Sequence, residues 1–139
     1  MKFSVRSDYA ARAVFGLATR YPTGQAVNAD ALATDQGIPA GYLVQILIEL
    51  KAKGIARSVR GKGGGYLLAR PPQDISLGDV IRAVDGTAFE TPALEDLDCP
   101  TELRQAWQRL QNSVNQAADS ITFQDLIDEG QDKEKMYYI

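Results

Sequence analysis

Residues 38–70 read IPAGYLVQILIELKAKGIARSVRGKGGGYLLAR, and this segment sets the architecture of the whole chain. Its first half carries apolar residues at the i, i+3, i+4 and i+7 spacing that one buried face of a helix produces. These residues are Leu43, Ile46, Leu47 and Leu50. Gly54 stands where a glycine commonly ends a helix. We therefore predict a helix that begins at Pro39 and ends before Gly54, with proline at its favoured first position.

Two short strand-like runs, 55–59 and 66–69, follow this helix and are separated by the turn GKGGG. Two prolines then end the second run, because proline cannot donate a hydrogen bond to a strand ladder. Between Lys51 and Arg70 there are six basic residues and no acidic one. A helix followed by a basic hairpin is typical of a winged helix-turn-helix, which binds duplex DNA. The predicted fold class is mainly α with a small β wing: a winged helix-turn-helix domain plus a long C-terminal dimerisation helix.

The residues before this segment complete the helix-turn-helix. A first helix is predicted over 7–20, with Ser7 as its cap and an alanine-rich buried face. Asn28 is expected to cap a short second helix over 29–36, and Gly37 separates that helix from the next. Two helices joined by a short glycine turn form a helix-turn-helix.

The face opposite the apolar stripe of the third helix is expected to read DNA bases, because its N-terminal part enters the major groove. Gln45 either pairs with an adenine edge or is a solvated glutamine, and Val44 either contacts a thymine methyl group or packs against a neighbour. Arg60 at the wing tip suits a narrow minor groove. The candidate DNA-contacting residues are Arg6, Ala40, Tyr42, Val44, Gln45, Ser58, Arg60, Gly61 and Lys62.

The glycine-rich turn is not a nucleotide-binding loop. Such a loop has Ser or Thr directly after its lysine and leads into a helix, whereas Lys62 is followed by Gly63 and a predicted strand. The chain also has no histidine and no motif of paired carboxylates. Because it shows no acid–base constellation, we predict that it is not an enzyme.

After the wing, Ser76 and Asp79 have the spacing of a capping box, and the helix that they begin is expected to end at Gly86. An acidic linker follows, and then a long helix with apolar residues spaced 4, 3, 4, 3 and 4 apart, which is a heptad seam. This seam either packs on its own domain or pairs with a second copy, and its length favours a dimer. The seam consists of Leu103, Trp107, Leu110, Val114, Ala117 and Ile121.

These observations divide the chain into four parts. The expected parts are a winged helix-turn-helix domain at 1–86, a linker at 87–100, a dimerisation helix with a short following helix at 101–129, and a C-terminal tail at 130–139.

The two halves of the chain differ strongly in charge. Residues 1–70 carry ten Lys and Arg against four Asp and Glu, whereas residues 71–139 carry five against fourteen. Such asymmetry indicates a nucleic-acid face on the first half and a solvated, repelled face on the second.

Composition restricts the location. No apolar run approaches the ~20 residues of a membrane span, and charges interrupt the start of the chain where a signal peptide needs an apolar run. The single cysteine, Cys99, excludes an internal disulfide and fits a reducing compartment. We therefore expect a cytoplasmic protein without membrane association.

Several motifs resemble those of the Rrf2 family of bacterial winged-helix transcription regulators. They are SDYA at 7–10, YLxQ at 42–45, SVRGxGGGYLL at 58–68, ISLGDVIRAVDG at 75–86 and SITFQDL at 120–126. The resemblance implies a homodimeric, sequence-specific DNA-binding regulator, in most cases a repressor, that reads a palindromic operator. It places Tyr42 and Gln45 on the recognition helix and Arg60 in the minor groove, and it implies a role in cysteine, sulfur or iron–sulfur metabolism.

Many members of that family hold an iron–sulfur cluster with three cysteines, whereas this chain has Cys99 alone. Because clusters are held mainly by thiolates, we predict no cofactor. The ending MYYI resembles the cysteine-metabolism repressor branch of the family, whose members work with O-acetylserine thiol-lyase, the cysteine synthase. That resemblance implies a docking role for Tyr138 and Ile139. The alternative function is a protein-interaction module that binds a partner enzyme through this tail without binding DNA.

Overall fold

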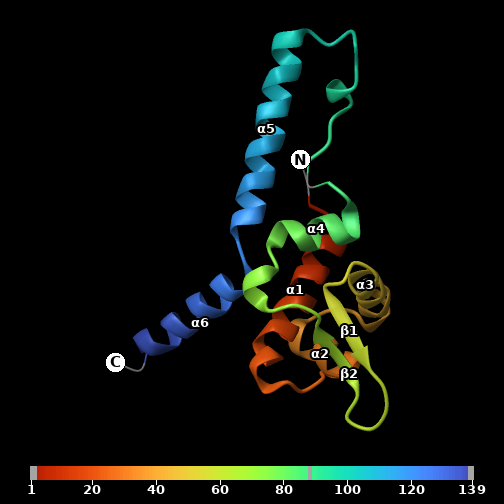
Figure 1. Ribbon diagram of the computed structural model, residues 1–139, viewed down its shortest axis with the longest axis vertical. Coiled ribbons are helices and arrows are strands. Elements are labelled where there is room, and N and C mark those ends of the chain that lie inside the picture. The colour runs from red at the N-terminus through yellow and green to blue at the C-terminus, as the bar shows by residue number, and fades with distance from the viewer. Residues whose placement is uncertain (1–2, 88, 138–139) are drawn as a thin grey trace.

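The computed structural model describes residues 3–87 and 89–137. A helical body carries a two-stranded wing at one end, and a long helix rises from the body as a rod (Figure 1). The helices are α1 (Val5–Arg20), α2 (Ala29–Gln36), α3 (Ala40–Ala52), α4 (Leu77–Asp85), α5 (Thr101–Ser120) and α6 (Phe123–Tyr137). The strands are β1 (Ala56–Val59) and β2 (Gly65–Leu68), and short 3-10 turns cover Tyr21–Thr23, Pro72–Asp74 and Pro92–Leu94. This arrangement confirms the predicted mainly α fold with a small β wing and a long C-terminal helix.

The core lies around α1, which α3, α4 and α6 surround. The apolar stripe predicted for α3 is confirmed, since its four members are at most 1% exposed. Phe123, at the start of α6, is equally buried and belongs to the same core. No helix within the described residues is both long and apolar enough to cross a bilayer.

The helix starts differ in part from the prediction. Ser4, and not Ser7, caps α1, because its hydroxyl oxygen accepts a hydrogen bond from the Ser7 N–H at 3.0 Å. Ser7 is instead buried, and its hydroxyl donates to Asp85 of α4 at 2.5 Å. Pro39 occupies the cap position of α3, so this helix begins one residue later than predicted.

The other predicted caps are confirmed. Asn28 accepts a hydrogen bond from the Ala31 N–H at 2.9 Å, and Gly37 ends α2 in a left-handed conformation. Ser76 and Asp79 each accept a hydrogen bond from the other's backbone N–H, at 3.0 and 2.9 Å, which is a complete capping box.

The wing is an antiparallel pair in which Ala56 lies opposite Leu68. Three of the four strand ends differ by one residue from the ends of the predicted runs. The sequence pattern did not reveal a further contact: Val27 and Tyr66 exchange two backbone hydrogen bonds, of 2.9 and 2.8 Å. This bridge attaches the wing to the residues that precede α2.

The rod α5 is joined to the body through its base. Main-chain hydrogen bonds run from Leu77 N–H to the Ile121 carbonyl at 2.8 Å and from Phe123 N–H to the Ile75 carbonyl at 3.0 Å. Arg82 of α4 adds an ion pair with Asp119 at 2.7 Å. Farther up the rod, linker residue Phe89 is buried and its ring centroid lies 6.2 Å from that of Trp107.

Helix α6 is longer than predicted. The expected tail at 130–139 and short preceding helix are replaced by a continuous helix that ends at Tyr137. Gly130 lies within that helix without a positive φ, so the glycine lowers its stability without ending it. Through Phe123, α6 packs on the body, although the sequence grouped it with the dimerisation helix.

Candidate nucleic-acid interface

The outer face of α3 is exposed and largely apolar. Tyr42, Val44 and Ile48 expose 49%, 49% and 53% of their surface, and Gln45 is also exposed. The buried stripe turns this face outward, because residues on opposite sides of one helix cannot share a surface. The face therefore presents the amide of Gln45 beside the apolar side chains of Val44 and Ile48, and apolar side chains can contact the methyl group of thymine.

The wing tip is exposed as well, and it is basic. Ser58, Arg60, Gly61 and Lys62 all lie at the surface, and Gly61 has a φ of +92°, which favours glycine. Lys51 of α3 donates a hydrogen bond from its Nζ to Ser58 Oγ of β1 at 2.8 Å. This bond joins the C-terminal part of α3 to the first strand of the wing.

Tyr42 is held in place from α1. Its ring meets the ring of Tyr9 edge to face, with centroids 5.4 Å apart, and the guanidinium of Arg12 lies 5.6 Å from the Tyr9 ring centroid. Edge-to-face packing restricts a tyrosine ring while leaving its hydroxyl free for a further partner.

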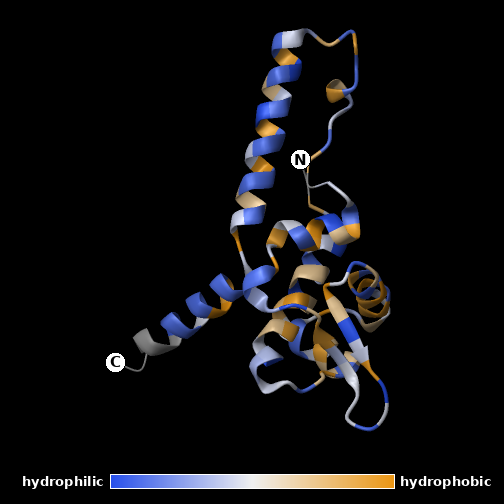
Figure 2. Cartoon of the chain, in the orientation of Figure 1, coloured by the Kyte–Doolittle hydropathy of each residue, from blue (hydrophilic) through white to orange (hydrophobic). Residues whose placement is uncertain are grey.

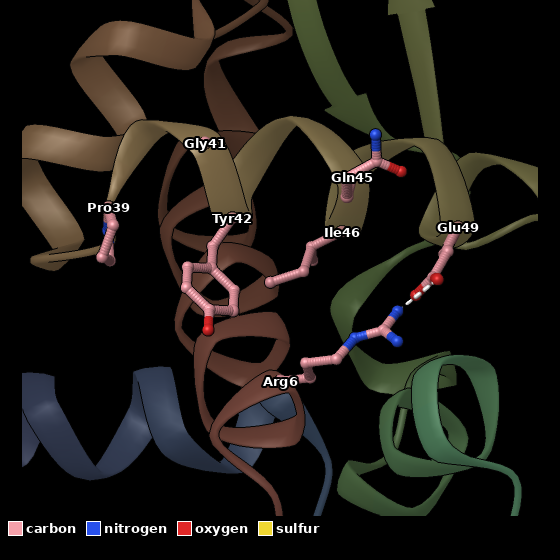
Figure 3. Close-up of a pocket in the computed structure, with 7 residues that line it drawn as sticks. All are labelled: Arg6, Pro39, Gly41, Tyr42, Gln45, Ile46 and Glu49. Carbon is pink, nitrogen blue, oxygen red and sulfur yellow. Dashed lines mark hydrogen bonds and ion pairs between the residues drawn. The ribbon is translucent and has the colours of Figure 1, made fainter.

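Arg6, predicted from sequence as a DNA contact, lies at the start of α1 and forms an ion pair with Glu49 of α3 (Figure 3). A hydrogen bond from Arg6 to this carboxylate, followed by their charge attraction, raises the pKa of Arg6 above its ordinary value. Arg6 is therefore always charged. Glu49 was not found from the sequence, because no local pattern relates residues 43 positions apart.

The remaining predicted site residues lie elsewhere. Ala40 is exposed at the first turn of α3, next to the candidate surface. The predicted dimerisation residues lie along α5 and at its end, and Leu103, Leu110 and Ile121 are exposed. Hydrophobic and hydrophilic segments alternate along α5 (Figure 2). The predicted docking residues, Tyr138 and Ile139, lie outside the described residues.

Comparison with known proteins finds matches among transcriptional regulators. The model of the Rrf2 family, described as iron-dependent transcriptional regulators, matches residues 3–129. A putative HTH-type transcriptional regulator of Mycobacterium tuberculosis is 38% identical over 131 residues, which cover 91% of this chain and 81% of the relative. The HTH-type transcriptional regulator CymR of Bacillus subtilis is 31% identical over 141 residues and covers both chains completely.

Solved structures show the same similarity. IscR of T. potens superposes with a TM-score of 0.81 at 31% identity, over 99% of this chain and 97% of that one. The structure of CymR, the global cysteine regulator of B. subtilis, superposes with a TM-score of 0.79 at 28% identity, over 91% and 95% of the two chains.

The family description raises the question of an iron site, and the residues of this chain do not fit one. Histidine is absent from the sequence, and Cys99 is the one cysteine. Within the described part of the chain, no three His, Cys, Asp or Glu side chains gather in a group that could hold a metal ion. Arg104 instead occupies the neighbourhood of Cys99, where it donates to the carbonyl oxygens of Asp96 and Cys99 at 2.7 and 3.0 Å.

Proposed function

Because the chain belongs to the Rrf2 family of transcriptional regulators, we propose that it acts as a homodimeric repressor that binds a palindromic operator. The observation that carries this proposal is the joint surface of α3 and the wing. The Lys51–Ser58 hydrogen bond links the two elements, and the exposed residues on both include amide, apolar and basic groups suited to DNA contact.

In this proposal each element reads a different groove. Gln45 pairs with an adenine edge in the major groove, and Val44 contacts a thymine methyl. The wing tip places Arg60 in the adjacent minor groove, where a narrow width concentrates negative potential. Tyr42, Ser58 and Lys62 contact the backbone and set the register of the base-reading residues.

The dimer is supported by the exposed apolar side chains of α5. Leu103 and Leu110 expose 47% and 43% of their surface on a rod that rises away from the body (Figure 2). Leucines at heptad spacing on such a rod are covered when a second copy packs against it. Two copies related by a twofold axis then match a palindromic DNA site.

Sulfur metabolism is the proposed field of regulation, since CymR of B. subtilis matches this chain over its full length. We extend the proposal to the segment 136–139 as a docking site for O-acetylserine thiol-lyase. Deleting these four residues should abolish co-purification with the synthase and leave dimerisation unchanged. Unchanged co-purification would reject this part of the proposal.

The main experiment is selection of duplexes by the purified protein from a random-sequence pool, followed by titration of the recovered duplex. We expect a palindromic consensus and a dissociation constant that rises steeply with salt, because phosphate contacts release counterions. Recovery of no consensus, together with no binding at low salt, would contradict the proposal and favour a protein-interaction module.

A further inference from the structure

A groove lies between the start of α1 and the flank of α3, beside the residues proposed to read bases. Its volume is about 510 Å³. Figure 3 shows Tyr42 and Glu49 projecting from α3 toward α1, and Arg6 reaching back from α1 to Glu49. The lining residues are Arg6, Pro39, Gly41, Tyr42, Gln45, Ile46 and Glu49.

The lining of this groove is suited to one sugar–phosphate unit of DNA. Carbon atoms of the exposed Pro39 offer contact for a deoxyribose ring, and the Arg6 guanidinium offers charge for a phosphate. Gln45 lines the same groove, so an occupant of the groove lies beside a base that Gln45 reads. Half or more of the hydrogen bonds between proteins and DNA go to the backbone, and they fix the register of base contacts.

Arg6 has hydrogen-bonding capacity left for such a contact. A guanidinium has five N–H donors, and the structure uses one nitrogen, Nη2, for Glu49 Oε1. The Arg6 side chain remains 42% exposed. The other oxygen of Glu49, Oε2, is buried and has no hydrogen-bond partner among the described residues. The Glu49 carboxylate is thus partly buried in the wall of the groove, and the arginine that it binds is the more exposed member of the pair.

A carboxylate on a helix that binds DNA repels the phosphates, so its presence there calls for a compensating role. We infer that Glu49 is a positioning residue that holds Arg6 in the orientation needed to bind a DNA backbone phosphate next to the base read by Gln45. Holding a long, flexible side chain in advance lowers the entropy that binding must remove. This inference rests on the proposed function. It means that an acidic residue, Glu49, promotes the binding of negatively charged DNA.

The test compares the variants Glu49→Gln, Arg6→Ala and the double variant with the wild type. The DNA is the duplex recovered by selection, titrated from about 50 to about 200 mM salt. The affinity of the wild type falls across this range. For a variant that lacks one phosphate contact, the factor by which affinity falls should be about threefold smaller. We expect Glu49→Gln to weaken binding at low salt and to reduce the salt dependence as Arg6→Ala does. In the double variant, the glutamine should add nothing to the effect of the alanine.

The matched control is Asp35→Asn, which removes the same charge from the exposed Arg20–Asp35 ion pair, neither member of which lines the groove. If charge alone acts, both Asp35→Asn and Glu49→Gln should strengthen DNA binding, so weaker binding by Glu49→Gln distinguishes positioning from charge. Arg6→Lys keeps the charge but loses the planar donors, and it should retain the salt dependence with reduced affinity. Thermal unfolding of each variant shows whether the variant is folded. Partial unfolding lowers the apparent affinity for DNA, but it does not change how the affinity of the folded protein depends on salt.

Two outcomes would overturn the inference: Glu49→Gln binding as tightly as the wild type or more tightly, or Arg6→Ala keeping the full salt dependence. An Arg60→Ala variant run in parallel separates this failure from failure of the proposed function. If Arg60→Ala weakens binding and Glu49→Gln does not, the groove contact alone is wrong. If the wild type binds no duplex, the proposed function itself is wrong.

Discussion

Gly65 lies so close to Val27 that a Cβ atom added to the glycine would come within 2.3 Å of the Val27 carbonyl oxygen. The φ of Gly65 is +152°, a value that other residues rarely adopt. The glycine thus permits the backbone bridge between Val27 and Tyr66, and that bridge sets where the wing stands relative to α2.

The first prediction concerns Gly65→Ala. Because the added methyl group meets backbone and not a movable side chain, we expect the wing to shift and the free energy of unfolding to fall by about 1–3 kcal/mol. Operator affinity should fall as well. Gly54→Ala is the control, since Gly54 also has a positive φ but has open space around it, and it should cost about 1 kcal/mol with little effect on DNA binding. Chemical denaturation and fluorescence anisotropy measure the two effects.

The second prediction concerns Arg60→Ala at the wing tip. Loss of an arginine from a minor groove should weaken operator binding by ~1–3 kcal/mol. Lys133→Ala removes one positive charge from an exposed position on α6 and should leave affinity almost unchanged. Equal effects of the two variants would show that only net charge matters at the wing.

The third prediction concerns the proposed dimer. Leu110→Glu places a charge in the heptad seam and should convert the dimer into monomers in sedimentation velocity, with a parallel loss of operator affinity. Gln105→Glu adds the same charge on the opposite side of α5 and should leave the mass unchanged. A Leu110→Glu protein that sediments as a dimer would place the contact elsewhere.

The fourth prediction concerns the capping box of α4. Burial acts to raise the pKa of Asp79, but hydrogen bonds from Ser76 and Arg82 outweigh burial and lower the pKa. The stabilisation is therefore fully present above the unfolded-state pKa of about 3.9 and is lost as pH falls through the lower folded-state pKa. At neutral pH, Asp79→Asn should lower the free energy of unfolding by about 1 kcal/mol. The difference from the wild type should shrink under strongly acidic conditions, as measured by urea titration at several pH values.

The fifth prediction concerns iron. Because the residues of this chain do not fit an iron site, anaerobically purified protein should show no cluster absorbance bands. Prior treatment with a chelator should leave operator affinity unchanged. A chelator-sensitive affinity would require ligands contributed by a second copy or by another molecule.

Local rules predicted much of the fold. The stripe of α3, the Asn28 cap and the Ser76–Asp79 capping box all depend on residues within a few positions of one another, and all three were found from sequence. The helix-turn-helix and the wing follow from these elements and from the glycine turn. Which face of α3 is exposed could be read directly from its apolar periodicity.

Contacts between distant segments were not predictable in the same way. Ser4, and not Ser7, caps α1, and the hydroxyls of both serines donate to Asp85 of α4, which lies 78 positions from Ser7. The partner of Arg6 and the bridge at Val27 likewise depend on tertiary packing. The length of α6 was missed because a glycine and a run of charges resemble a helix end, although neither prevents a helix from continuing.

Two main-chain hydrogen bonds, Leu77–Ile121 and Phe123–Ile75, and the Arg82–Asp119 ion pair connect the base of α5 to the body. We therefore expect α5 and α3 to move together as one rigid unit. If two copies pair along α5, the distance between their α3 helices is then fixed. Operators with one extra or one missing base pair between half-sites should then be rejected, even when every base that the protein touches is correct.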